Sequence, residues 1–216
     1  IASCLVGSEM CIRDRFLSRS NLALSVSMTA LSTMAAIVMT PLLTSSLSGN
    51  EIDVDAMGLF YSTLKVVLVP VVLGIFLNAQ LPRYTQKIQF YSPSIAVILI
   101  TLIVASIIGQ GKEIILSSGV SLIFSIMTLH LIGFVLGYFL SKFLLKDEAV
   151  SRTISVEVGM QNSGLGVVLA KENFVNPAVA IPAAISSLVH SLYGSLFVAL
   201  FRIKMANPIQ KINQTE

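Results

Sequence analysis

The stretch that decides the fold runs from Ile154 to Gly166 and reads ISVEVGMQNSGLG. It lies within an apolar segment long enough to cross a membrane, yet it contains a carboxylate, two amides and three glycines. Glu157 is the only acidic residue at the centre of any apolar stretch. A carboxylate at bilayer depth is unfavourable in free energy unless a positive charge or polar groups compensate it. Its presence therefore indicates a functional site. The alternative is a buried glutamate that pairs with a basic residue for packing alone.

The composition is that of a membrane protein, because 55% of the 216 residues are hydrophobic and only 12% are charged. A membrane-spanning helix needs about 20 mainly apolar residues, and six stretches meet this requirement. They are Ala23–Ser48, Ala56–Ala79, Ser92–Gly109, Ile114–Leu145, Ala149–Ala170 and Ala178–Phe201. The sequence therefore predicts an all-α polytopic membrane protein in contact with the lipid bilayer. Nucleic acid is not an expected partner.

Residues 1–15 form a separate block. From Leu5 to Asp14 the block looks like one continuous reading frame of a common transposase-type sequencing-library adapter. We therefore expect it to be an artefact and exclude it from fold reasoning; a genuine polar tail is the alternative. Both cysteines, Cys4 and Cys11, lie in it, so no disulfide, thiol catalysis or thiolate metal site is expected in the remaining chain. We also expect the natural chain to extend further at its N-terminus.

The first span carries a column of hydroxyl groups. Ser25, Thr29 and Ser32 recur at i, i+4 and i+7, so they share one face of a helix. This column can line a cation site inside the protein, or it can serve helix packing, as small hydroxyl residues often do in membranes. The residues alone favour packing.

The other spans carry fewer polar signals. Lys65 lies about eight residues from the acidic end of the second span, within reach of that membrane interface, and is interpreted as an anchor rather than a catalytic group. The third span has no polar group that indicates a site. On the fourth span, Gly133 and Gly137 have the spacing that lets helices approach closely. His130 lies alone on the same span and is interpreted as a hydrogen-bonded structural residue rather than a ligand or a proton relay. The two histidines of the spans, His130 and His190, look dispersed. The predicted connectors are an acidic segment (Asn50–Asp55), a polar loop (Leu81–Tyr91), a tight turn (Gln110–Glu113), a basic loop (Ser141–Arg152) and a polar tail (Arg202–Glu216).

The loop charges predict the orientation in the membrane. If Arg19 is cytoplasmic, nine basic residues lie on its side and only Lys112 and Lys171 lie on the other. The nine are Arg19, Arg83, Lys87, Lys142, Lys146, Arg152, Arg202, Lys204 and Lys211. The positive-inside rule then places the C-terminus in the cytoplasm and the acidic connector outside.

The central stretch has the chemistry of a sodium site. Glu157 and Gln161 are four residues apart, and glycines between and after them weaken the helix. If the helix unwinds there, the carbonyl groups of Val158 and Met160 become free acceptors. Hard cations prefer oxygen ligands, and a carboxylate supplies the negative charge. A broken helix can bind a cation on one side and help to hold an anionic substrate on the other.

Two motifs carry a resemblance to a known family. The segment Asn21–Thr29 (NLALSVSMT), followed by Thr40–Thr44 (TPLLT), is similar to the fifth helix of the bile acid:sodium symporter family. Glu157–Gly164 (EVGMQNSG) resembles its ninth, interrupted helix, and His190 with its neighbours resembles the tenth. The likeness covers the chain after Arg15.

The resemblance implies six helices of a ten-helix, inverted-repeat transporter, with an interrupted helix at residues 149–171. Residues 16–48 would be the last helix of the first repeat, in a core domain, and 49–110 a panel-type helix pair. Residues 111–203 would be core helices including the interrupted one, and 204–216 a cytoplasmic tail. Helices one to four would be absent, together with a partner interrupted helix and a third-helix glutamine that completes a sodium site.

The resemblance also implies the site residues. One sodium site would use Ser25, Thr29 and Glu157, and a second would use Glu157, Gln161 and the carbonyls of Val158 and Met160. Asn162 and His190 match positions that face the substrate crevice, where family members often have Asn at the position of Ser191. The implied coupling ion is Na⁺, with no organic cofactor.

The resulting hypothesis is a sodium-coupled symporter of an organic anion, in a bacterial inner membrane, working by alternating access. The anion could be a steroid conjugate, a keto acid or another small carboxylate. An intramembrane enzyme would need a nucleophile–base pair or clustered carboxylates and histidines, which the spans do not offer. A sodium-binding sensor or channel is the remaining alternative.

The charge asymmetry makes a direct prediction about orientation. An Asp53→Cys variant of the full-length protein should react with an impermeant thiol reagent added outside intact cells, because the acidic connector faces out. Labelling that requires membrane permeabilisation would reverse the orientation.

Overall fold

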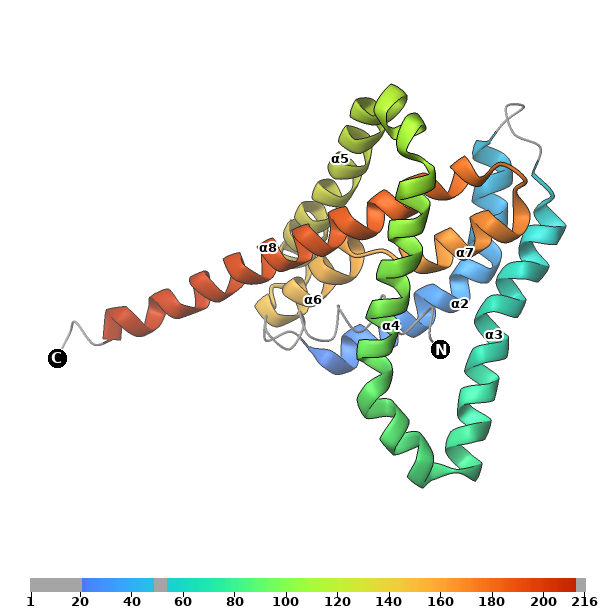
Figure 1. The fold of residues 1–216 in the computed structure, drawn as a ribbon. Helices are drawn as coiled ribbons and strands as arrows, with labels where there is room; N and C mark the ends of the chain where they lie inside the picture. Colours follow the sequence, from blue (N-terminus) through green and yellow to red (C-terminus); the bar gives the residue numbers. More distant parts are fainter. Residues whose placement is uncertain (1–20, 49–53, 213–216) are drawn as a thin grey trace.

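The computed structural model describes residues 21–48 and 54–212, and every regular element in these ranges is a helix (Figure 1). In chain order the elements are α2 (Leu22–Leu47), α3 (Ala56–Gln80), α4 (Pro82–Gln110), α5 (Lys112–Leu145), α6 (Glu148–Gly159), α7 (Ser163–Asn173), the short 3₁₀ helix η1 (Pro177–Ala180) and α8 (Ile181–Ile212). The predicted all-α class is confirmed. The adapter-like block and most of the acidic connector lie outside the described residues.

Four segments of the described chain are long and apolar enough to cross a membrane: Ala23–Leu47, Ala56–Gln80, Gly119–Leu145 and Pro177–Phe201. A shorter apolar helix, Ile98–Gln110, forms the second half of α4. The remaining predicted span is divided between α6 and α7, so the interrupted helix is confirmed. Many large apolar side chains are exposed on these helices, as on a surface that faces lipid.

Two predicted loops are wrong, because the helices extend into them. The helix predicted at Ser92–Gly109 begins at Pro82, since a proline at the first helical position already has a helical φ and needs no hydrogen-bond partner. The basic loop is reduced to Lys146 and Asp147. Lys146 adopts the left-handed conformation that ends α5, at φ 56°. The tight turn after Gln110 is confirmed, with Gly111 alone between α4 and α5.

The polar tail is also more regular than predicted, because α8 continues past Phe201 to Ile212. The side chains beyond Ile203 are not described. Only residues 213–216 of the predicted tail lie outside the described helix.

A polar cluster joins the ends of α5 and α6. The hydroxyl of Tyr138 donates to Oε1 of Glu148 at 2.6 Å, and Lys142 pairs with the other carboxylate oxygen. Arg152, predicted as a loop charge, is buried in α6 with a guanidinium nitrogen 3.8 Å from Glu148. The cluster therefore ties α6 to α5 at the end where the chain turns between them.

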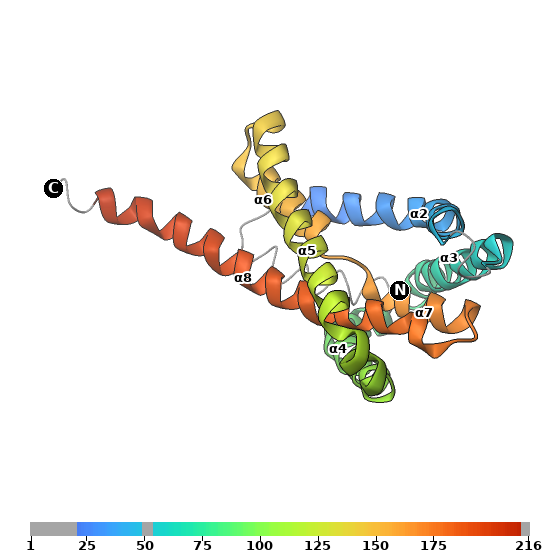
Figure 2. The ribbon, with the colours of Figure 1, turned by 90° about the horizontal axis from the view of Figure 1, so that it is seen from above.

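The helices form an open assembly rather than a closed bundle (Figures 1 and 2). α5 packs along α6 and crosses α8, and α7 packs on α8. α2 lies against α3 and α6. Figure 1 shows α3 and α4 as two arms that diverge from their junction at Leu81. The arms reach different partners, since α3 contacts α7 whereas α4 contacts α8.

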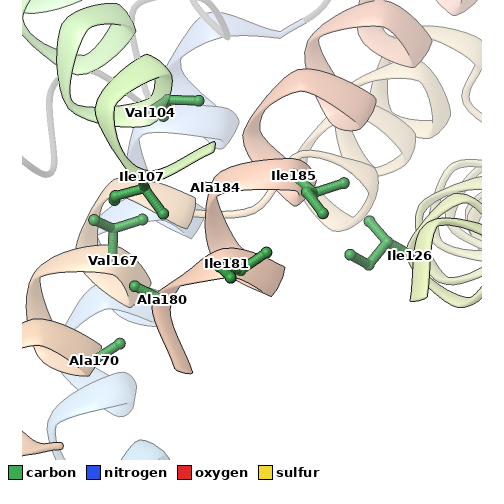
Figure 3. Close-up of a cluster of buried hydrophobic side chains, with 9 residues drawn as sticks. All are labelled: Val104, Ile107, Ile126, Val167, Ala170, Ala180, Ile181, Ala184 and Ile185. Carbon is green, nitrogen blue, oxygen red and sulfur yellow. The ribbon is translucent and has the colours of Figure 1, made fainter. Parts of the chain in front are cut away.

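Two of the three apolar clusters among the described residues join the arms to the other helices; the third packs Phe134 of α5 against Val156 and Met160. The first joins α4, α5, α7, η1 and α8 and is drawn in Figure 3; it consists of Val104, Ile107, Ile126, Val167, Ala170, Ala180, Ile181, Ala184 and Ile185. The second joins α2, α3 and α7 through Ile37, Leu59, Val67, Leu165 and Leu169. A polar pair reinforces it, because the Ser62 hydroxyl donates to Oδ1 of Asn173 at 2.9 Å. Both clusters contain residues of α7, which therefore links the two arms.

The backbones of α5 and α6 approach each other closely. A Cβ atom added to Gly133 or Gly137 would lie 3.1 Å from the backbone of α6, so the predicted close packing at these glycines is confirmed. On α6, a Cβ atom at Gly159 would lie 2.3 Å from the ring of Phe134. That ring is fully buried and stacked on Phe197, with ring centroids 4.7 Å apart. It has little room to move aside.

We expect Gly159→Ala to destabilise the protein by about 1–3 kcal/mol, because the added methyl group overpacks the α5–α6 interface. Thermal unfolding in detergent, followed by intrinsic fluorescence or circular dichroism, would measure the loss. Gly119→Ala is the matched control, since its Cβ would meet only Ile115 at an ordinary 3.4 Å. Alanine also has the higher helix propensity there. Equal unfolding temperatures for the two variants would contradict the packing argument.

Candidate functional site

The break between α6 and α7 is three residues long: Met160, Gln161 and Asn162. α6 continues through Gly159, and Met160 then turns extended, with φ −94° and ψ 122°. The side chain of Asn162 caps α7, its Oδ1 accepting from the backbone N–H of Leu165 at 3.1 Å. Asn162 is predicted to face the substrate; in this structure it is half-buried and serves as the helix cap.

Glu157 meets the hydroxyl column of α2 just before the break. The Ser25 hydroxyl donates to Oε2 at 2.9 Å, and the Thr29 hydroxyl lies 2.6 Å from Oε1. Ser25 is fully buried. Ser32, the third member of the predicted column, is exposed and donates to the carbonyl of Thr29. The structure thus brings Ser25 and Thr29, but not Ser32, to the carboxylate.

The start of α2 is anchored on α6 as well. The backbone N–H of Asn21 donates to Oγ1 of Thr153 at 2.8 Å, and Asn21 caps α2 by accepting from the N–H of Leu24. Thr153 lies one turn before Glu157 on α6. The hydrogen bond between Asn21 and Thr153 therefore sets the position of Ser25 along α6, next to the carboxylate.

The other predicted sodium ligands lie within or beside the break. Val158 has its carbonyl oxygen against α5, 3.1 Å from the position of a Cβ on Gly133. Met160 is buried, and its N–H completes the last turn of α6 by donating to the carbonyl of Val156 at 2.9 Å. Gln161 is exposed toward a cavity. These residues are contiguous with Glu157, and their role as ligands remains a prediction.

A cavity of about 510 Å³ lies between α4, the break and α8. Its lining consists of Ile100, Thr101, Val104, Ala105, Ile108, Gly109, Gln161, Ser163, Gly164, Ser187, Leu188, His190 and Ser191. Of the two predicted substrate residues, His190 lines it. Gln161, predicted as a sodium ligand, lines it as well. None of these lining residues carries a carboxylate, an amine or a guanidinium group.

The sequence predicts two dispersed histidines, and this prediction is wrong. The rings of His130 on α5 and His190 on α8 are 5.4 Å apart and edge to face. Nδ1 of His130 is 2.8 Å from the carbonyl oxygen of Gly159, and its Nε2 is 2.7 Å from the hydroxyl of Ser186. The predicted structural role of His130 agrees with these hydrogen bonds. Nδ1 of His190 is 3.1 Å from the hydroxyl of Ser163.

Sequence reasoning missed several cavity residues. The third predicted span carries no evident site signal, yet Thr101 lies in the cavity wall together with the small residues Ala105 and Gly109. Their spacing of four residues puts them on one helix face, which is the signal that could have identified them. Within the described ranges, no three His, Cys, Asp or Glu side chains come together as a metal-binding group.

Comparison with known proteins identifies the family. Residues 1–118 match the family model described as the Sodium Bile acid symporter family. This range includes residues 1–15, whose interpretation as an adapter remains a prediction.

Curated relatives match almost the whole chain. A probable chloroplastic sodium/metabolite cotransporter, BASS1, is 48% identical in Oryza sativa subsp. japonica and 45% identical in Arabidopsis thaliana. Each match covers 94% of this chain and 50% of the relative. An uncharacterized sodium-dependent transporter, YocS, of Bacillus subtilis (strain 168) is 37% identical, over 95% of this chain and 64% of its own length. The chain thus spans about half the length of the chloroplast relatives.

These relatives are named as transporters and not as enzymes. The family model matches more than half of the 216 residues, and the chain therefore belongs to the sodium bile acid symporter family.

Proposed function

We propose that the full-length protein is a sodium-coupled symporter of an organic anion. The observation that carries the proposal is the contact of two α2 hydroxyls with the Glu157 carboxylate, at 2.9 and 2.6 Å, beside a broken membrane helix. A carboxylate at this depth needs a compensating charge. A sodium ion supplies that charge and takes oxygen ligands of the kinds gathered here.

The first sodium site consists of Ser25, Thr29 and Glu157. Both hydroxyls lie at hydrogen-bond distance from the carboxylate, and Oγ1 of Thr29 is also 3.0 Å from the carbonyl oxygen of Ser25. Sodium binding requires each hydroxyl to turn its hydrogen away from the ion, which the Ser25 carbonyl allows for Thr29, and to offer a lone pair. A hydroxyl can do so because it is both a donor and an acceptor. Oxygen atoms from two helices would then surround the ion, and the ion would strengthen the contact between α2 and α6.

The second sodium site consists of Glu157, Gln161 and the carbonyl groups of Val158 and Met160. The extended backbone at Met160 supports this assignment, because it interrupts the helix directly after the carboxylate. Both sites would share one negative charge. Loss of Glu157 would therefore affect both ions together.

The substrate site is the cavity beside the break, which His190 lines. Asn162, the other predicted substrate residue, caps α7 next to the cavity. Its volume of about 510 Å³ falls in the range of small-molecule pockets. The lining combines hydroxyl, amide and imidazole groups with apolar side chains, which suits a partly apolar organic anion. Relatives named sodium/metabolite cotransporters support a small metabolite, and the family description keeps a bile acid-like steroid as a candidate.

Transport would proceed by alternating access between two groups of helices. Residues 16–48 and 111–203 form the proposed core and residues 49–110 the panel, followed by the predicted cytoplasmic tail at 204–216. The cavity supports this division, because α4 contributes its panel wall and α7 and α8 contribute its core wall. Movement of α4 relative to α8 would open and close the cavity. The protein would lie in a bacterial inner membrane, with a cytoplasmic C-terminus.

A sodium-binding sensor or channel could use the same ion site. Accumulation of a labelled anion against its gradient, driven by sodium, separates a symporter from both alternatives.

We expect Glu157→Gln to abolish sodium-driven uptake in the full-length protein, because it removes the negative charge and keeps the size of the side chain. Uptake of a panel of labelled carboxylates into proteoliposomes, with and without a sodium gradient, would measure transport. Sodium should also no longer raise the unfolding temperature of the variant. Normal sodium dependence in Glu157→Gln would make the carboxylate structural and place the ion site elsewhere.

Ser25→Ala and Thr29→Ala should each raise the sodium concentration for half-maximal transport about tenfold or more and leave residual transport. Each removes one neutral ligand and leaves the carboxylate. Ser32→Ala is the matched control on the same helix, since its hydroxyl is exposed and, among the described residues, donates to the backbone of Thr29 rather than to the carboxylate. An equal shift for Ser32→Ala would show that loss of α2 stability, rather than loss of a ligand, is responsible.

A further inference from the structure

Two buried histidines hold the two ends of the helix break. His130 bonds to the carbonyl of Gly159, the last residue of α6, and His190 bonds to the hydroxyl of Ser163, the first residue of α7. Both rings are almost fully buried, at 1% and 5% exposure. Neither histidine lies on the broken helix itself, so α5 and α8 fix its ends from outside.

The hydrogen bonds of His130 determine where its proton lies. A carbonyl oxygen can only accept, so Nδ1 carries the proton that it donates to Gly159. Nε2 of the neutral ring is then an acceptor, and it takes the hydroxyl proton of Ser186 on α8. The neutral ring thus satisfies both partners, and it connects α6 to α8 through α5.

The two rings also connect the ion side of the break with the cavity side. Gly159 is two residues from Glu157, whereas His190 and Ser163 line the cavity. The rings touch edge to face at a centroid distance of 5.4 Å. A shift of the Gly159 carbonyl would therefore act on His130, whose ring is bonded to Ser186 and packed against His190.

We propose that His130 and His190 are positioning residues that transmit sodium binding at Glu157 to the shape of the cavity. The proposal rests on the proposed sodium site. Energetic coupling between two sites needs differential contacts in two states, and a packed chain of hydrogen-bonded side chains is one physical route for it. Here the route runs from the Gly159 carbonyl through the two rings to Ser163.

Two substitutions of His130 separate its contacts. In His130→Asn the amide nitrogen occupies the place of Nδ1, so the donor to Gly159 is kept, whereas the hydrogen bond to Ser186 and the ring contact with His190 are both lost. In His130→Gln the amide reaches the place of Nε2, so the contact with Ser186 is kept and the Gly159 carbonyl loses its donor. The first variant should disconnect the cavity from an intact ion site, whereas the second should weaken the ion site itself.

The test uses sodium alone as the ligand, in the full-length protein without its other cysteines. Ser187→Cys provides a reporter in the cavity wall, and its rate of reaction with a small thiol reagent is measured across sodium concentrations. The rise in unfolding temperature with sodium reports ion binding independently. Ser125→Ala is the control on α5, because its hydroxyl is exposed and, within the described part of the chain, donates to the backbone carbonyl of Ser121.

We expect sodium to change the reporter rate at least about fivefold in the parent and in Ser125→Ala, the lower end of typical coupling. In His130→Asn the rate should become independent of sodium, while the sodium concentration for half-maximal stabilisation changes less than about threefold. In His130→Gln that concentration should rise at least about fivefold. A reporter in His130→Asn that still responds fully, or a loss of sodium binding in that variant, would overturn the proposed link. A parent that shows no stabilisation by sodium would instead refute the proposed sodium site.

Discussion

The structure depends on the contact between the Glu157 carboxylate and the hydroxyls of Ser25 and Thr29. A carboxylate in an apolar environment is unfavourable unless polar groups surround it. Two neutral donors lower this cost without neutralising the charge, and they come from a helix more than 100 residues away in the sequence. The contact therefore determines the position of α2 relative to α6. The hydrogen bond from the backbone of Asn21 to Thr153 belongs to the same interface.

A broken helix inside a membrane leaves backbone groups that water cannot satisfy. In this structure three groups form hydrogen bonds with the backbone around the break. Asn162 caps the N-terminus of α7, the N–H of Ser163 donates to the carbonyl of Gln161, and His130 donates to the carbonyl of Gly159. The bond from His130 is possible because α5 lies close to α6. This close approach requires glycine at positions 133 and 137 of α5. The same packing that supports the break therefore also supplies its donor.

Much of the architecture follows from the sequence because apolar length and glycine content act locally. The spans, the interruption after Glu157 and the close packing at Gly133 and Gly137 all depend on residues near each other in the chain. The pairing of Ser25 and Thr29 with Glu157 could be predicted in part, because helical spacing puts the two hydroxyls on one face and the family resemblance places them near the carboxylate. The neighbourhood of His130 and His190 was not, because it depends on how α5 crosses α8. The predicted loop boundaries are wrong where charged residues lie within a helix, as Arg83 does in α4 and Arg152 does in α6.

The cavity wall has no ionised carboxylate, amine or guanidinium among its described lining residues. Recognition there would rely on shape and on the pattern of hydroxyl and amide groups, with the attraction for an anion coming from ions bound nearby. Exchanging one hydroxyl for a methyl group in such a wall alters fit without disturbing a charge pair. Under the proposed function, such a wall would allow new substrates to be acquired through small, independent changes on α4 and α8, while Glu157, the proposed ion-binding carboxylate, stays the same.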